Sequence, residues 1–298
     1  MKKLVTSLVA AIALSATSAL AADMPTKAKV VAPAPAPSPF DIAFGGSIMS
    51  DYNFRGVSQS DRGPSVSAYV EPQFNTAFGT LYVGLAGYAI SWPSGPGYAF
   101  TSPSAEIDIY GGWRNTWGAF SLDLGALYYF YPSESFNGFT DDSDFLELYA
   151  KATYALTPDL TLGANVFWTP DLLNYSQSFG AGADDVSAFY FSATAKWVTP
   201  WKAGDLGFFV SGELGHWAID DSNWITAGLF DPSYTYWNVG FALTYKVFTL
   251  DFRYHGTDMS RTDCTNFLIV GPNNGARNWC DDTFIASLKF DTTLAALK

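Results

Sequence analysis

The stretch FTLDFRYH, residues 248–255, decides the fold of this chain. Its even-numbered residues are apolar or aromatic, and its odd-numbered residues include Asp251, Arg253 and His255. A β-strand points successive side chains to opposite faces, so this segment has one apolar and one charged face. A strand of a soluble sandwich gives the same alternation, because its polar face lies in water. The number of such segments, their connections and a secretion signal favour a transmembrane barrel instead.

Segments with this alternation recur from Phe40 to Phe290. We expect about twelve strands, at residues 40–54, 65–77, 80–90, 104–114, 118–131, 145–155, 159–169, 186–198, 205–217, 234–246, 248–256 and 283–291. Short turns alternate with long loops, as outer-membrane barrels show when the turns and both termini are periplasmic and the loops are extracellular. The sequence therefore predicts an all-β fold, a transmembrane antiparallel β-barrel that forms one domain over residues 40–298.

The N-terminal residues have the features of an export signal. Residues 1–21 combine a basic start, an apolar stretch and an Ala-x-Ala cleavage site at Ala19–Ala21, which indicates a Sec signal peptide. A retained membrane anchor is the alternative, and the short apolar stretch and the processing site count against it. Residues 22–39 are rich in Ala and Pro and predict a flexible periplasmic linker. No other stretch approaches the roughly 18 to 20 apolar residues of a membrane helix, so only a closed sheet could span a bilayer.

The composition agrees with a barrel in the outer membrane. Aromatic residues make up 17% and charged residues 15% of the chain, with a mean hydropathy of +0.07. These values suit an apolar outer face diluted by a polar lumen and polar loops. The formal net charge of −12 disfavours a nucleic-acid partner. The expected partners are outer-membrane lipids and lipopolysaccharide, the barrel-assembly machinery and small polar solutes.

Aromatic residues on the apolar faces fall near both ends of the strands. They predict two girdles at the membrane interfaces, Phe74, Phe120, Tyr154, Trp197, Tyr245 and Phe248 beside short turns, and Tyr52, Phe54, Tyr128, Phe130, Trp168, Phe189 and Tyr254 beside long loops. The alternative is that aromatic residues are simply good strand formers.

Charged residues follow the opposite parity and are expected to face the lumen. These candidate pore-lining residues are Asp51, Arg55, Glu71, Glu106, Asp108, Arg114, Asp123, Glu147, Lys151, Lys196, Glu213, Asp251, Arg253 and Lys289, together with His255. An Arg or Lys facing the middle of the hydrocarbon would cost roughly 2 to 4 kcal/mol, which explains the confinement to one face. Two interpretations stay open, a narrow pore and a lumen filled by paired charges. The excess of acids favours a weak preference for cations.

The segment SDYNFRGVSQS, residues 50–60, followed by Gly63-Pro64, closely resembles the first-hairpin signature of the TorF family of porin-like proteins. The resemblance is specific in this segment, and elsewhere it rests only on the regular succession of predicted strands and loops. It implies an outer-membrane barrel of porin type and no catalytic residues. One departure is the chain end, because such barrels usually end on an aromatic residue and here Phe290 is followed by residues 291–298.

The chain has only two cysteines, Cys264 and Cys280, and both fall in the last long loop. In an exported protein, a pair in one loop predicts a disulfide. Metal binding is the competing interpretation, and the absence of a Cys-x-x-Cys motif disfavours it.

Two further function classes remain beside a diffusion channel. Some outer-membrane barrels cleave lipids with a lipid-facing serine and histidine, and counting through the turn at 199–204 places Ser187 roughly opposite His216. No third residue to orient His216 is evident, so we expect no enzyme, and no cofactor is predicted. A non-conducting structural or adhesive barrel is the other alternative. The sequence favours a porin-like channel for passive diffusion of small polar solutes or ions.

Overall fold

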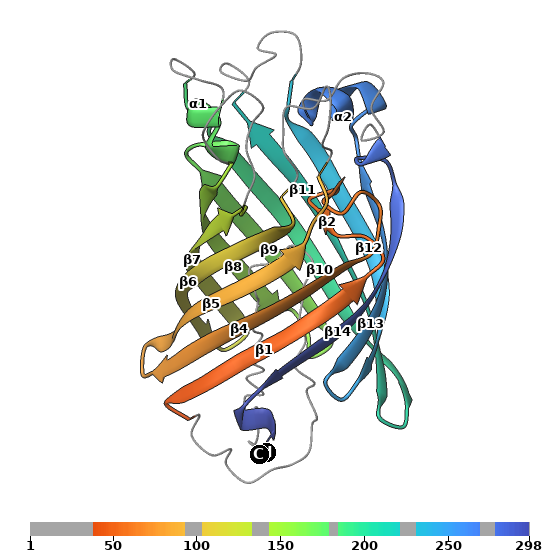
Figure 1. The fold of residues 1–298 in the computed structure, drawn as a ribbon. Coiled ribbons are helices and arrows are strands. Elements are labelled where there is room, and N and C mark those ends of the chain that lie inside the picture. Colours follow the sequence, from red (N-terminus) through yellow and green to blue (C-terminus); the bar gives the residue numbers. More distant parts are fainter. Residues whose placement is uncertain are drawn as a thin grey trace, which may run out of the picture.

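A closed antiparallel barrel of twelve strands forms the body of the protein in the computed structural model (Figure 1). The structure describes residues 38–92, 103–132, 143–178, 184–220, 231–268 and 278–297. The strands are β1 (Phe40–Met49), β4 (Ser65–Thr76), β5 (Gly79–Ala89), β6 (Ala105–Trp117), β7 (Phe120–Phe130), β8 (Phe145–Ala155), β9 (Leu160–Thr169), β10 (Ala188–Ala203), β11 (Leu206–Ile219), β12 (Tyr234–Tyr245), β13 (Phe248–Thr257) and β14 (Thr283–Thr293). Each strand pairs with its neighbours in the chain, and β1 closes the barrel by pairing with both β4 and β14.

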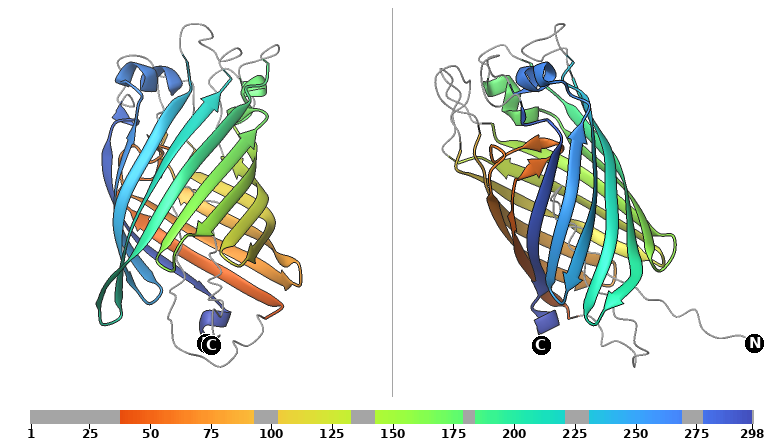
Figure 2. Two further views of the ribbon diagram at one scale, coloured as in Figure 1. Left: turned by 180° about the vertical axis from the view of Figure 1, so that it is seen from behind. Right: turned by 90° about the vertical axis from the view of Figure 1, so that its right-hand side faces the viewer.

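The two ends of the barrel differ, and we call them the loop end and the turn end. Short turns join β4 to β5, β6 to β7, β8 to β9, β10 to β11 and β12 to β13 at the turn end. The loop end carries the longer connections, with η1 (Leu172–Asn174), α1 (Tyr175–Ser178) and α2 (Arg261–Phe267), whereas η3 (Ala295–Leu297) lies at the turn end (Figures 1 and 2). None of the described helices is long and apolar enough to span a membrane. The predicted signal peptide, nearly all of the linker and the middle of several loops lie outside the described residues.

The first predicted strand is wrong in its last five residues, 50–54. β1 ends at Met49, and residues 50–64 turn into the barrel as a small hairpin with the strands β2 (Asn53–Phe54) and β3 (Val57–Ser58). We call residues 50–64 the inward hairpin. Arg55 and Gly56 form its two-residue turn with φ angles of 48° and 92°. Positive φ at both positions is the geometry that matches the twist of paired strands, and glycine supplies it at the second position without steric cost.

Side chains on the barrel wall alternate as the sequence predicts. Outward positions carry large apolar residues such as Ile48, Leu214 and Phe284, which are 62%, 58% and 60% exposed. The aromatic residues predicted for the girdles also face outward at the strand ends, with two exceptions. Tyr52 and Phe54 belong to the inward hairpin, where Tyr52 is 3% exposed. They do not contribute to an outer girdle, because the chain leaves the wall before it reaches them.

The predicted disulfide is confirmed. Cys264, in α2, is bonded to Cys280, which precedes β14. α2 begins with a capping box, in which the Ser260 hydroxyl accepts from the Asp263 N–H and the Asp263 carboxylate accepts from the Ser260 N–H. The disulfide therefore ties a short capped helix at the loop end to the start of the last strand.

Candidate functional site

The lumen contains the charged residues that the sequence places there. Apart from Asp51 and Arg55, which belong to the inward hairpin, the candidate residues lie on inward-facing positions of the strands. Most are buried, namely Glu71, Glu106, Asp108, Asp123, Glu147, Lys151, Asp251, His255 and Lys289, whereas Arg114, Lys196, Glu213 and Arg253 are partly exposed.

The inward hairpin reaches the opposite wall of the barrel through Arg55. Its Nη1 donates to Oε1 of Glu147 at 2.7 Å, and its Nη2 donates to Oε2 at 2.8 Å. Glu147 lies on β8, which is separated from β1 by β4 to β7 on one side and by β14 to β9 on the other. Both side chains are 1% exposed. This fork-shaped pair therefore spans the lumen with a buried, charge-assisted contact.

Aromatic rings surround the Arg55 guanidinium. Its central carbon lies 4.7 Å from the ring of Phe54, 5.0 Å from Phe167, 4.3 Å from Tyr190 and 4.6 Å from Trp217. Ring faces attract a cation, and the attraction strengthens when water is excluded. The rings and Glu147 together compensate for the loss of hydration of the guanidinium.

A second contact joins the inward hairpin to β6. The Tyr52 hydroxyl donates to Oε1 of Glu106 at 2.6 Å, and Tyr131 donates to Oε2 of the same carboxylate at 2.9 Å. The ring of Tyr52 stacks on Tyr88 of β5, with 4.6 Å between centroids. Tyr52 is thus fixed both by its hydroxyl and by its ring, on a different part of the wall from Arg55.

The inward hairpin also holds itself together. Asp51 accepts from the hydroxyls of Ser58 at 2.6 Å and Ser60 at 3.0 Å, and the Ser60 hydroxyl accepts from the Tyr52 N–H at 2.8 Å. Asn53 Oδ1 accepts from the Gly56 N–H at 2.9 Å, which closes the turn. Burial raises the pKa of the Asp51 carboxyl, and the hydrogen bonds from the two serines lower it in part. Asp51, Asn53, Ser58 and Ser60 thus form hydrogen bonds within the segment that hold its shape.

Residues 58–62 of the inward hairpin contact residues 278–281, which include Cys280 of the disulfide. The Arg62 guanidinium donates to the carbonyls of Asn278 and Asp281, and the indole N–H of Trp279 donates to Asp61 at 3.0 Å. The Ser58 N–H donates to the Trp279 carbonyl at 3.0 Å. Because Trp279 directly precedes Cys280, the disulfide holds this support in place.

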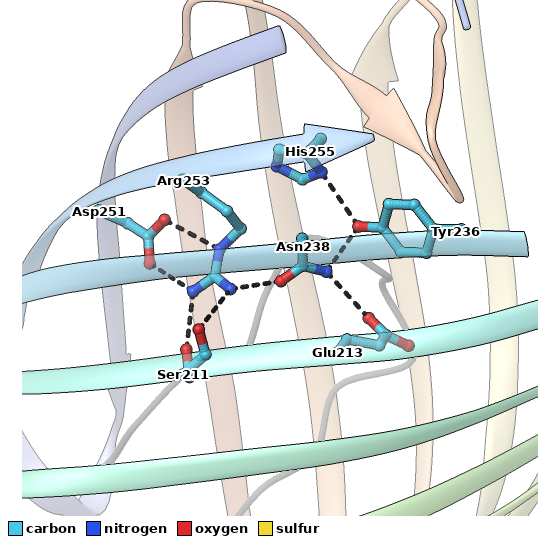
Figure 3. A network of polar contacts seen from close by, with 7 residues as sticks. All are labelled: Ser211, Glu213, Tyr236, Asn238, Asp251, Arg253 and His255. Carbon is cyan, nitrogen blue, oxygen red and sulfur yellow. Dashed lines mark hydrogen bonds and ion pairs between the residues drawn. The ribbon is translucent and has the colours of Figure 1, made fainter. Parts of the chain in front are cut away.

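A polar network lines the inner face of β11, β12 and β13 (Figure 3). Arg253 donates to both oxygens of Asp251 at 3.1 and 3.0 Å, to Asn238 Oδ1 at 2.5 Å and to the Ser211 hydroxyl at 2.8 Å. The Asn238 amide donates in turn to the Tyr236 hydroxyl at 2.6 Å and to Glu213 at 3.3 Å. The charges of this network therefore pair along the wall and not across the lumen.

The same is true near the turn end, on the other side of the barrel. Arg114 of β6 pairs with Glu71 of β4, and Gln73 donates to the same carboxylate at 2.8 Å. Lys151 lies over the Tyr149 ring, with Nζ 4.2 Å from its centroid. These contacts lie along the wall and do not cross the lumen.

Exposure of the inward side chains changes along the barrel. On β10, Tyr190 and Ser192 toward the loop end are buried, whereas Thr194 and Lys196 toward the turn end are partly exposed. On β11, Trp217 is buried and Glu213 partly exposed. On these two strands the inward side chains are thus buried toward the loop end, where the inward hairpin lies, and partly exposed toward the turn end, whereas Glu71, Asp123 and Lys151 near the turn end of other strands are buried.

The proposed pair of Ser187 and His216 is not formed. The register places His216 opposite Phe191, and the main-chain carbonyl of Ser187 accepts from the N–H of Asp220. His216 Nδ1 lies 3.2 Å from the Thr235 hydroxyl instead. The count through the turn was wrong because β10 runs past residue 198 to Ala203, with an irregular register between Val198 and Lys202, and the turn lies at 204–205. Among the described residues, no cluster of three or more His, Cys, Asp or Glu could hold a metal ion.

Sequence reasoning missed the aromatic content of the lumen. Besides Tyr52 and Phe54, inward-facing Tyr88, Tyr129 and Tyr190 are buried there. Their parity matches that of the charged residues on the same strands, which was the available signal. The Arg55-Gly56 turn was a weaker signal, because the pairs most typical of such turns begin with Asn, Asp or Gly.

Comparison with known proteins identifies a family. A family model described as "Bacterial protein of unknown function" matches residues 33–291, and a search of curated proteins found no match. An outer membrane channel from Pseudomonas putida F1 is 12% identical, with a TM-score of 0.48 over 89% of this chain and 100% of that one. OprB from Pseudomonas putida is 11% identical, with a TM-score of 0.39 over 86% and 94%.

LpxR from Salmonella typhimurium is 8% identical, with a TM-score of 0.40 over 84% of this chain and 99% of that one. At such identities and scores, these likenesses carry no argument about function. The family match covers most of the chain, including all twelve strands apart from the last two residues of β14. The chain therefore belongs to the Gcw_chp family of bacterial proteins of unknown function.

Proposed function

We propose that the protein is a porin-like outer-membrane channel for passive diffusion of small polar solutes or ions, closed at its outer end by the inward hairpin. The observation that carries this proposal is the contact of Arg55 with Glu147 across the lumen. The described part of this chain has a polar lumen, and the inward hairpin narrows it at the loop end. The resemblance of residues 50–60 to the TorF signature supports the same function.

The apolar outer face supports a location in the outer membrane. Lipid would cover the outward side chains, such as Ile48 and Leu214, and the lumenal charges would stay away from hydrocarbon. The loop end would then face the exterior, where lipopolysaccharide lies, and the turn end the periplasm. Export by the Sec pathway and insertion by the barrel-assembly machinery complete this proposal, with the outward Phe284, Leu288 and Phe290 of β14 as the internal recognition signal.

The contacts of the inward hairpin define what opening requires. Opening must separate Arg55 from Glu147 and Tyr52 from Glu106, or must shift these contacts together. On the wall, Arg114 pairs with Glu71 and Arg253 with Asp251, so these charges do not depend on the inward hairpin for neutralisation, whereas Glu147 does. Displacement of the inward hairpin therefore leaves a polar passage lined by the wall networks.

A weak preference for cations follows from the lumenal charges. The inward acids are Asp51, Glu71, Glu106, Asp108, Asp123, Glu147, Glu213, Asp251 and Asp291, and the inward bases are Arg55, Arg114, Lys151, Lys196, Arg253 and Lys289. A low-dielectric wall focuses the field of such an excess and raises the local concentration of cations.

Swelling of proteoliposomes in small sugars tests the proposal. We expect slow swelling with the wild type and fast swelling with a variant whose residues 51–62 are replaced by a short Gly-Ser link, with rates that fall as the sugar becomes larger. Protein-free liposomes set the baseline. If the wild type and the variant both swell no faster than protein-free liposomes, the result would instead favour a non-conducting structural barrel. The close packing at the loop end supports this second candidate.

A further inference from the structure

Three buried carboxylates lie on the wall beside the inward hairpin. Glu106 and Asp108 are two residues apart on β6 and share its inward face, and Glu147 lies on β8. Their exposed fractions are 2%, 2% and 1%. Among the described residues, one base pairs with this group, and it is Arg55, which binds Glu147. Acids therefore outnumber bases in this part of the closed lumen.

Glu106 and Asp108 differ in their hydrogen bonds. The Glu106 carboxylate accepts from the hydroxyls of Tyr52 and Tyr131, which support a negative charge. Oδ1 of Asp108 is buried without a hydrogen-bond partner, and no described base pairs with this residue. An ionised carboxylate in such surroundings loses its hydration without compensation, so burial disfavours its charged form. Asp108 is therefore the member of the group with the strongest reason to bind a proton when it is buried.

The inward hairpin contacts residues on both sides of Asp108. Tyr52 donates to Glu106, the next inward residue of β6 toward the loop end. Phe54 packs edge-on against Tyr129, with 5.9 Å between the ring centroids, and Tyr129 lies opposite Asp108 in the register of β6 and β7. Displacement of the inward hairpin would admit water to this face, and hydration favours the ionised carboxylate.

We propose that Asp108 links docking of the inward hairpin to pH. Asp108 binds one proton from water when the inward hairpin docks and releases it when the inward hairpin is displaced. Acid therefore favours the docked form, and alkali favours the displaced form. For one proton, the ratio of displaced to docked molecules changes by at most roughly tenfold for each pH unit. The consequence for transport rests on the proposed function, whereas docking is measured without transport.

Other titratable or charged groups surround Asp108. They are Glu106 of β6, Tyr88 of β5, Tyr129 of β7 and Tyr131 after it, Glu147 of β8, and Tyr52 and Arg55 of the inward hairpin. Two more groups could respond to pH at the inward hairpin itself. Asp51 belongs to it and would act in the same direction as Asp108. His255 contacts Tyr236, against which Gly56 lies, and a buried charge on His255 in acid would have the opposite effect, displacement.

The experiment follows docking by the reactivity of a thiol in the inward hairpin. Val57→Cys places this thiol at a position that is 2% exposed in the docked form. Asp159→Cys, at an exposed position of the turn end, corrects for the effect of pH on the thiol reaction. Both full-length barrels, folded in detergent micelles, react with a maleimide at low and at high pH, three units apart. We expect the ratio of the rate at position 57 to that at position 159 to rise by roughly fivefold or more at high pH.

Variants in the Val57→Cys background assign the response to one carboxyl group. Asp108→Asn keeps the shape of the side chain and removes its titration, so the ratio should stay low at both pH values. Asp123→Asn is the matched control, because Asp123 is another buried inward acid and accepts from Tyr82 of the wall. It should keep the full response, and so should Asp51→Asn. Asp108→Ser takes the place of Asp108→Asn if that variant does not fold.

The inference is overturned if the ratio does not depend on pH, or if the response persists without the Asp108 carboxyl. A ratio that rises in acid, or a response that disappears in Asp51→Asn, would also contradict it. Single-channel recording at the same two pH values separates this inference from the proposed function. A conducting channel with pH-independent docking would refute the inference alone. A pH-dependent inward hairpin in a barrel that never conducts would refute the proposed function and leave the link to Asp108 standing.

Discussion

Arg55 and Glu147 are 92 residues apart in the chain, yet they form a fork-shaped ion pair across the lumen near the loop end. Glu147 also accepts from the Tyr129 hydroxyl at 2.9 Å, so each carboxylate oxygen has at least one donor. Because both side chains are only 1% exposed, water does not reach either one to compensate for the loss of the other. The pair therefore links the tip of the inward hairpin to one residue of the opposite wall.

Glu147→Gln should destabilise the protein strongly. It leaves the Arg55 charge buried without a carboxylate, which costs about 3 to 5 kcal/mol. The measurement is urea unfolding in lipid vesicles. Glu213→Gln is the matched control, because Glu213 is partly exposed and accepts hydrogen bonds from Tyr190 and Asn238 without a direct ion pair. It should cost only about 1 kcal/mol, and equal losses in the two variants would contradict the special role of the pair.

The disulfide makes a separate prediction. Protein purified without reductant should contain no free thiols, and Cys264→Ser should contain one while the barrel still inserts. The lost cross-link should lower the free energy of unfolding by roughly 3 kcal/mol in the chain-entropy model. Thiol titration of the denatured protein is the check, and two reactive thiols in the oxidised wild type would refute it.

The orientation of the barrel is testable with single cysteines. Asp231→Cys lies at the loop end before β12, and Asp159→Cys lies at the turn end before β9, both at exposed positions. The native cysteines are bonded and do not react. A membrane-impermeant maleimide should label position 231 on intact cells, and position 159 only after permeabilisation. The reverse pattern would place the inward hairpin at the periplasmic side.

Ion preference should depend on salt and on the acids beside the inward hairpin. We expect the variant without the inward hairpin to prefer K⁺ over Cl⁻ at low salt, and the preference to fade as the Debye length falls toward roughly 3 Å at 1 M. Asp108→Asn should weaken the preference, because Asp108 is a buried inward acid. Reversal potentials across a KCl gradient provide the measurement, and Cl⁻ preference at low salt would show that the bases set the selectivity.

The strands could be predicted from the sequence because each one repeats the same alternation of apolar and polar residues. Their ends were less certain, and the error at β10 and β11 misplaced Ser187 relative to His216. The inward hairpin could not be recognised in this way. Asp51, Asn53 and Arg55 continue the inward parity of β1, so the pattern is the same whether the chain stays in the wall or turns into the lumen.

The lumenal contacts show a second limit of sequence reasoning. Parity predicts that Arg253 and Asp251 share a face, and they form an ion pair as nearest neighbours on one face of β13. Parity says nothing about the choice of Glu147 as the partner of Arg55, since that choice depends on the closure of the barrel and the depth that the inward hairpin reaches. Long-range pairs of this kind need the three-dimensional structure.

The central claim is that the inward hairpin closes a channel and that Arg55 holds it in place. Single-channel recording in planar bilayers tests it most directly, with Arg55→Ala compared with the wild type and with Arg114→Ala. Arg114 pairs with Glu71 on the wall, and among the described residues it makes no hydrogen bond or ion pair with the inward hairpin. We predict a mostly closed wild type, a several-fold higher open probability in Arg55→Ala and wild-type gating in Arg114→Ala. If Arg55→Ala and the wild type show the same open probability, whether both stay silent or both stay open, the inward hairpin is not the gate.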